Sequence, residues 1–154
     1  MSNKAQNSPQ TWSRQQWLGL LSKAPADTLA ALAGPFVDGL DHAVLRAPES
    51  GAVMARGRAG ATGAPFNMGE ITITRASVEL PGGLVGHGYV QGRDKAHALR
   101  VAQIDALLQT DTATAVTEAV LEPLAAAKAQ ERAARAAKAA ATKVDFFTLA
   151  RGED

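Results

Sequence analysis

The chain has no cysteine among its 154 residues, and only 5% of its residues are aromatic. The lack of cysteine excludes a disulfide, an iron–sulfur cluster and a thiol nucleophile within this chain, and it suits a reducing compartment. Acidic and basic residues nearly balance, with a formal net charge of +1 and a pI near 8.1. Charge therefore gives no strong pull towards nucleic acid or a membrane surface, and we expect neither as a partner.

Long apolar runs are missing as well. No stretch approaches the ~20 residues that a membrane-spanning helix needs, and residues 1–10 are polar. We therefore expect neither a signal peptide nor a transmembrane helix, and we expect a cytoplasmic location. A chain of this length is most simply one domain with a real core. The sequence predicts a disordered leader over 1–10, a single domain over 11–143 and a docking tail over 144–154.

The order of the expected elements predicts an α+β fold, in which antiparallel hairpins form a small sheet packed with N-terminal and C-terminal helices. Capping residues and apolar spacing predict two N-terminal helices, the second ending at Gly34-Pro35. Another helix is expected from Asp94 to about Gln109. Pro123 is then expected to kink a further helix or to start the alanine-rich helix that follows it.

Strands are expected in the middle of the chain. Residues 43–47 and 52–58 are expected to pair as a hairpin, because typical turn residues separate them. Glycine and proline predict a loop over 57–69. A second antiparallel hairpin is expected over 70–91, with a type II turn at its centre. Its first strand has apolar residues on both sides, which predicts a bulge near Arg75 or a sheet covered on both faces.

The junction between the last strand and the next helix concentrates the most unusual residues. Gly92 frees the backbone at the turn, and Asp94 is a suitable N-cap. The free N–H groups of the helix start, together with Arg93 and Lys95, would form a positive spot suited to a phosphate or a carboxylate. A capped helix flanked by solvated basic residues is the competing interpretation, and such helices are common.

His97 heads the apolar stripe of this helix. A histidine in that position is more often a hydrogen-bonded core residue than a catalytic base or a ligand. Arg93 and Arg100 flank it on adjoining turns, so an anion at the helix start could meet several donors from one surface. The other histidines, His42 and His87, lack the paired spacing of a metal site, and we predict no metal.

The alanine-rich segment carries a broad basic face. Its members are Lys128, Arg132, Arg135 and Lys138. A helix that binds a nucleic-acid groove could have this pattern, but no aromatic residues interleave with the charges, so a solvated or partner-facing helix is favoured. Near the end of the chain, Phe146 and Phe147 lie outside any helical stripe. Exposed apolar residues in a tail favour docking onto a partner or onto the body of the chain.

Several blocks of residues carry a resemblance that covers nearly the whole chain from Trp12 to the end. The blocks are Arg75, Gly92-Arg93-Asp94-Lys95 with His97-Ala98, Asp105-Ala106-Leu107, Pro123-Leu124, and Val144-Asp145-Phe146-Phe147-Thr148 with Arg151-Gly152. In this order and separation they closely resemble the PhnG family, whose members are the smallest subunit of the bacterial carbon–phosphorus lyase core complex. One departure is Ala61, which stands where glycine is expected.

The resemblance implies that the chain assembles with PhnH, PhnI and PhnJ subunits in phosphonate catabolism. In the implied reaction, an alkylphosphonate displaces adenine from the ribose of ATP, and the triphosphate stays on C5. A separate radical step then breaks the carbon–phosphorus bond, and the iron–sulfur cluster and S-adenosylmethionine of that step are implied only for a partner subunit. The resemblance implies no cofactor for this chain.

The residues themselves suggest a supporting role in such a complex. No nucleophile–base pair, metal constellation or carboxylate pair emerges, so we expect a non-catalytic or auxiliary subunit that is inactive alone. The rival hypothesis is a stand-alone binding module for small phosphorylated ligands at the helix start. The predicted phosphate-binding residues are Arg93, Lys95, His97 and Arg75, and the predicted docking residues are Phe146 and Phe147.

Overall fold

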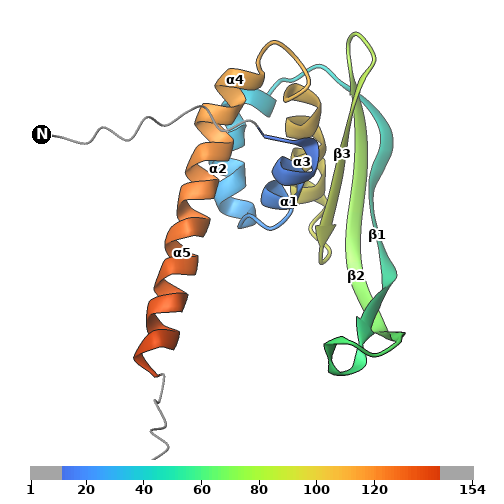
Figure 1. The fold of residues 1–154 in the computed structure, drawn as a ribbon. Helices are drawn as coiled ribbons and strands as arrows, with labels where there is room; N and C mark the ends of the chain where they lie inside the picture. The colour runs from blue at the N-terminus through green and yellow to red at the C-terminus, as the bar shows by residue number, and fades with distance from the viewer. Residues whose placement is uncertain (1–11, 143–154) are drawn as a thin grey trace, which may run out of the picture.

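The computed structural model describes residues 12–142, which form a three-stranded antiparallel sheet with helices on one of its faces (Figure 1). The predicted α+β fold, a small antiparallel sheet of hairpins packed with helices in a single domain, is confirmed. The predicted leader and docking tail, including Phe146 and Phe147, lie outside the described residues. In chain order the elements are α1 (Arg14–Leu21), α2 (Ala26–Val37), β1 (Ala43–Arg58), η1 (Ala59–Ala61), β2 (Pro65–Leu80), β3 (Leu84–Gln91), α3 (Lys95–Leu107), α4 (Ala113–Val116), η2 (Thr117–Leu121) and α5 (Glu122–Ala141).

Both N-terminal helices are present. Ser13 caps α1 in a capping box, in which its side chain accepts from the Gln16 N–H and the Gln16 side chain accepts from the Ser13 N–H. The expected end of the second helix at Gly34-Pro35 is wrong, because α2 continues to Val37. Pro35 lies in the last turn, where it removes only one backbone hydrogen bond, and the buried Val37 anchors that turn in the core.

The expected hairpin between residues 43–47 and 52–58 is also wrong. These segments form one continuous strand, β1, which pairs with β2 from Ala43 opposite Glu79 to Arg58 opposite Pro65. The turn residues fit inside the strand because the register shifts between Arg46 and Glu49, and because β1 is an edge strand. This irregularity lies opposite Arg75, so a bulge does occur near Arg75, but in the neighbouring strand.

The chain reverses direction at 59–64, and the expected loop over 57–69 is therefore too long. Residues 65–69 belong to β2 and pair with β1. In the short turn, Ala61 has a φ of 66°, in the left-handed region that favours glycine. The following hairpin of β2 and β3 is confirmed. Gly82 at the third position of its turn has a φ of 103°, and the Gly83 N–H donates to the Leu80 carbonyl at 3.0 Å, as a type II turn requires.

Helix α3 is the centre of the core. It lies between the sheet on one side and helices α1 and α2 on the other (Figure 1), and every residue from Val101 to Leu108 is buried. The expected stripe of His97, Val101, Ile104 and Leu108 is buried, but it is only part of the buried surface. Pro123 lies in the first turn of α5, which follows the π-helical turn η2. Of the two expected roles for Pro123, a kink or a helix start, the structure shows the helix start. Within 12–142, no helix combines the length and the apolar content that crossing a membrane requires.

Two glycines allow α3 to lie directly on β3. A Cβ atom added to Gly86 would lie 1.9 Å from the carbonyl oxygen of Ala102, and one added to Gly88 would lie 1.9 Å from the carbonyl oxygen of Ala98. The helix presents its own small residues, Ala98, Ala102 and Ala106, at intervals of four residues along this contact. Because the obstacle is helix backbone, no side-chain rotation could make room for a methyl group.

We predict that Gly88→Ala destabilises the chain by about 3 kcal/mol, because the helix must move away from the sheet and open the core. Urea unfolding followed by circular dichroism measures this loss. Gly51→Ala in β1 is the matched control, since a Cβ atom there meets nothing within 4 Å. Equal stabilities for the two variants would show that the close contact has no energetic importance.

Candidate functional site

The strand-to-helix junction has the geometry that the sequence predicts. Gly92 has a φ of 95°, and Asp94 caps α3 by accepting the His97 N–H at 2.8 Å. The Gly92 N–H donates to the Thr72 carbonyl at 2.9 Å, and the buried Thr74 hydroxyl donates to the Gly92 carbonyl at 2.7 Å. The turn is therefore fixed to β2 by backbone and side-chain hydrogen bonds.

The predicted phosphate-binding residues do not share one surface. Arg93 and Lys95 are exposed beside the helix start, and neither forms an ion pair within residues 12–142. His97 is only 7% exposed, and its Nε2 lies 3.0 Å from the Leu21 carbonyl, so this ring joins α3 to α1 inside the core. These are the burial and the hydrogen bond of a core histidine.

Arg75 lies on the other face of the sheet from α3. Ala76 and Val78 in the same strand are buried in the core. Because successive side chains of a strand point to opposite faces of the sheet, Arg75 points away from that core. The Arg75 guanidinium donates to Glu49 at 2.8 Å. The hydrogen bond from Arg46, and to a smaller extent the one from Arg75, lowers the pKa of Glu49. Arg75 thus has a carboxylate partner from this chain, and a phosphate site that includes it stays a prediction.

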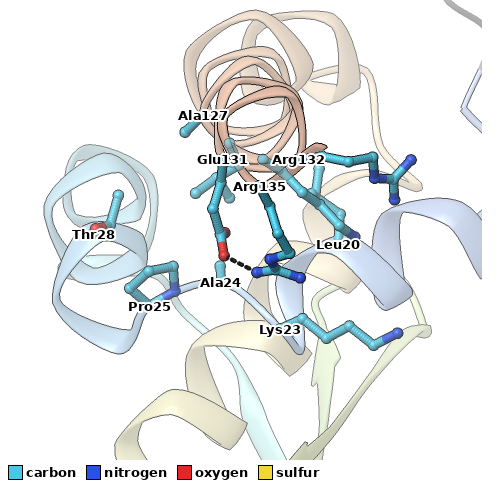
Figure 2. A pocket seen from close by; sticks show the side chains of 11 residues that line it. Leu20, Lys23, Ala24, Pro25, Thr28, Ala127, Glu131, Arg132 and Arg135 are labelled. Atoms are coloured by element: carbon cyan, nitrogen blue, oxygen red, sulfur yellow. Dashed lines mark hydrogen bonds and ion pairs between the residues drawn. The ribbon is translucent and has the colours of Figure 1, made fainter. Parts of the chain in front are cut away.

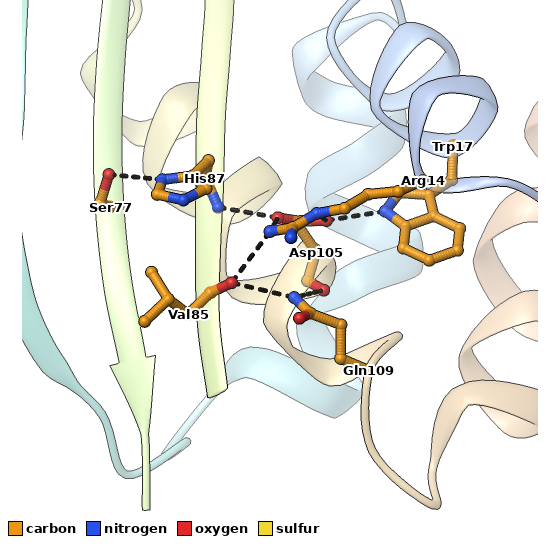
Figure 3. A network of polar contacts seen from close by, with 7 residues as sticks. All are labelled: Arg14, Trp17, Ser77, Val85, His87, Asp105 and Gln109. Atoms are coloured by element: carbon orange, nitrogen blue, oxygen red, sulfur yellow. Dashed lines mark hydrogen bonds and ion pairs between the residues drawn. The ribbon is translucent and has the colours of Figure 1, made fainter. Parts of the chain in front are cut away.

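A buried carboxylate organises the most extensive polar network of the described residues (Figure 3). Asp105 is fully buried and accepts from the Arg14 guanidinium at 2.7 and 3.1 Å, from the Trp17 indole N–H at 2.8 Å and from the His87 backbone N–H at 2.8 Å. The hydrogen bond with Asp105 raises the pKa of Arg14, which stays charged. These donors replace the hydration that the carboxylate loses on burial.

The same network covers part of the exposed edge of β3. The Val85 carbonyl accepts from Arg14 and from the Gln109 side chain, each at 2.9 Å, while the His87 N–H donates to Asp105. Side chains of α1, of α3 and of Gln109 just after α3 therefore occupy edge groups to which another strand would otherwise pair. Because the donors around Asp105 hold its oxygens, we interpret this carboxylate as structural and not as a catalytic base.

Sequence reasoning missed the roles of Arg14 and Trp17 in this network. Trp17 is half-buried against the core, but the hydrogen bond of its indole is not visible in the apolar spacing of the first helix. One signal was available. Asp105 is a single acid inside the buried run of α3, and a buried acid needs donors from other elements.

The distal part of the β1–β2 hairpin, residues 53–71, is the other feature that the sequence did not predict. We call it the hairpin arm. β3 pairs only with residues 73–80 of β2, so the arm is two-stranded, and it extends past α1, α2 and α3 in Figure 1. None of its residues is buried. Its exposed large apolar side chains are Met54, Phe66, Met68 and Ile71.

The hairpin arm suits contact with another protein better than contact with water. An isolated two-stranded ribbon is marginally stable, and clustered apolar side chains on such a ribbon favour burial against a partner. Arg56 and Arg58 near its tip add positive charge. No group of three or more potential metal ligands lies within the described residues, and the absence of a metal stays a prediction.

We predict that Asp105→Ala lowers the stability of the chain by about 3 kcal/mol or more, because Arg14, Trp17 and His87 lose a buried acceptor. Asp111→Ala removes the same charge from an exposed loop position and is the control. Unfolding in urea at neutral pH gives both values. A cost at Asp105 no larger than the cost at Asp111 would refute the structural role of the network.

The chain is similar to known proteins over most of its length. Residues 12–152 match the family described as "Phosphonate metabolism protein PhnG". A protein of Rhizobium meliloti (strain 1021) named "Alpha-D-ribose 1-methylphosphonate 5-triphosphate synthase subunit PhnG" is 44% identical over 141 residues, which cover 92% of this chain and 90% of that protein. The family match includes the sheet, the Asp105 network and all of α5, and the chain belongs to the PhnG family of phosphonate metabolism proteins.

Proposed function

We propose that this chain is a non-catalytic subunit of an α-D-ribose 1-methylphosphonate 5-triphosphate synthase, the activity named for its Rhizobium relative. In this reaction an oxygen of the alkylphosphonate bonds to C1 of the ribose of ATP, adenine leaves, and the triphosphate remains on C5. The proposed partners are PhnH, PhnI and PhnJ subunits. We also propose a cytoplasmic location, because the ATP that the reaction consumes is available there.

The exposed apolar side chains of the hairpin arm are the main support for assembly with partner subunits. The arm presents apolar side chains on a two-stranded ribbon that no other described element covers. Phe66 is 48% exposed and Met68 is 67% exposed. Burying these side chains in a partner subunit would stabilise both the ribbon and the complex.

The buried polar residues support a non-catalytic role. Thr74, His97 and Asp105 are each buried and hydrogen-bonded to groups of this chain, and these contacts support structural roles for them. The chain has no cysteine, and we propose that the iron–sulfur cluster and S-adenosylmethionine of carbon–phosphorus bond cleavage belong to a partner subunit.

Co-expression with PhnH, PhnI and PhnJ subunits of the same organism tests this function. We expect one complex on size exclusion that releases adenine from ATP and methylphosphonate, while the purified chain alone releases none. Adenine is measured by liquid chromatography. Metal-independent turnover by the chain alone would overturn the non-catalytic assignment, and failure to co-elute with any of the three subunits would overturn the assembly assignment.

The hairpin arm gives a more specific prediction. Phe66→Ser combined with Met68→Ser should weaken assembly by about 2 kcal/mol or more, because buried aromatic and methionine side chains dominate such interfaces. Leu45→Ser is the control, since Leu45 is similarly exposed on β1 outside the arm. Dissociation constants from interferometry, with the variants equally folded by circular dichroism, decide the outcome. Equal affinities for the double variant and the wild type would remove the arm from the interface.

The predicted phosphate site at the helix start is tested separately. If Arg93 and Lys95 hold a phosphate of the substrate, Arg93→Ala and Lys95→Ala should raise the KM of the assembled complex for ATP or methylphosphonate about tenfold, because charge-assisted hydrogen bonds are worth roughly 1.5–3 kcal/mol. Assembly and melting temperature should stay unchanged. His97→Gln should instead lower the melting temperature, since His97 is buried. Early melting or lost assembly with an unaltered KM in the Arg93 and Lys95 variants would show that these residues are structural.

A further inference from the structure

A pocket opens between α5 and the turn that joins α1 to α2 (Figure 2). Its volume is about 330 Å³. Leu20 and Leu124, both buried, and Ala24 form an apolar floor. The pocket is separate from the hairpin arm and from the Asp105 network, and none of the functions described above uses it. It is large enough to receive an apolar side chain from outside the chain.

The rim of this pocket is strongly basic. Lys128, Arg132 and Arg135 line it from α5, and Lys23 faces them from the other side (Figure 2). Glu131 is the acid among the lining residues, and it pairs with Arg135. Four cations against one carboxylate leave a net charge of +3 around one opening, although the whole chain carries only +1. A ligand of this pocket should therefore be anionic.

The cations form a line along the helix. With about 3.6 residues per turn, Lys128, Arg132 and Arg135 lie on one side of α5 and span roughly 10 Å of its axis. We call these three residues the basic stripe. The basic stripe is longer than a single phosphate group, and the apolar floor of the pocket makes no favourable contact with a phosphate. An elongated ligand with both carboxylates and an apolar side chain fits the stripe and the floor together.

Helix α5 also has surface to cover. Leu124 is the one buried residue of α5, whose whole length is described, and every residue from Ala126 to Ala141 is exposed. In Figure 1 this part of the helix extends away from the rest of the chain. Its alanines favour the helical state, so this part of α5 presents a ridge on which another helix can pack.

We infer that the pocket and the basic stripe dock an acidic helical segment of a partner subunit. One large apolar side chain of that segment enters the pocket between Leu20 and Leu124, and its carboxylates, spaced by one helical turn, contact Lys128, Arg132 and Arg135. Lys23 closes the opposite side. This inference rests on the proposed function, since the occupant is a subunit of the same complex.

Photo-crosslinking within the co-expressed complex identifies the occupant. A benzophenone amino acid is incorporated in place of Ala127, which lines the pocket, or in place of Ala133 as the control on the other side of α5. We expect the Ala127 position to crosslink to a partner peptide with net negative charge, as read by mass spectrometry, and the Ala133 position to give no such product. A crosslink to a neutral or basic peptide, or none in an intact complex, overturns the inference.

Charge substitutions give an independent readout. Lys128→Gln, Arg132→Gln and Arg135→Gln together should weaken assembly about tenfold at low salt, and the difference from wild type should shrink as salt rises. For the matched comparison, Arg132→Gln and Gln130→Glu each change the net charge by −1, but Gln130 lies on the far side of α5. Equal effects of these two single substitutions would mean that net charge, and not the stripe, controls binding.

The remaining outcomes separate this inference from the proposed function. If the wild-type chain joins no complex, the proposed function fails first. If the wild type assembles and releases adenine while the triple variant assembles with equal affinity, only the docking inference fails. Calorimetry of the chain alone with ATP tests a small-anion site, and saturable binding that the triple variant abolishes would assign the pocket to a phosphate ligand instead of a partner helix.

Discussion

The close contact of α3 with β3 is the constraint on which the rest of the fold depends. Gly86 and Gly88 bring the strand so near to the helix that a methyl group on either would meet helix carbonyl oxygens. This closeness places Asp105 beside the edge of β3, where it accepts the His87 N–H as well as the Arg14 side chain. The same helix carries the Asp94 cap and the buried His97 ring. Sheet, helices and polar network are therefore fixed by one interface.

Local chemistry predicts the elements whose signals are contained in a few neighbouring residues. Asp94 as an N-cap, the turn at Gly82 and the apolar stripe of α3 are all found in the structure. The single long strand β1 was missed because Pro48 and Gly51 look like a turn, and only pairing with β2 across a bulge keeps them extended. Contacts such as Trp17 with Asp105 join elements 88 residues apart in sequence, and local patterns do not encode them.

The chain combines a packed body with two extensions, the hairpin arm and the exposed length of α5, which no other described element covers. The body satisfies its buried polar groups almost entirely; the indole N–H of Trp12 is the buried side-chain donor without a partner among the described residues. The hairpin arm and the exposed length of α5 instead present apolar and basic side chains outwards. In a subunit, such a division separates folding from assembly, because each extension gains its contacts only in the complex. The candidate site of this chain is therefore best described as a pair of contact surfaces.

Hydrogen–deuterium exchange of the chain, alone and in the co-expressed complex, tests this division most directly. We expect amides of β3 and α3 to be strongly protected in both states, and amides of the hairpin arm (residues 53–71) and of α5 beyond Leu124 to gain protection in the complex, as this division requires. Unchanged exchange in the arm and α5, together with a large gain of protection in β3 and α3 on assembly, would contradict it.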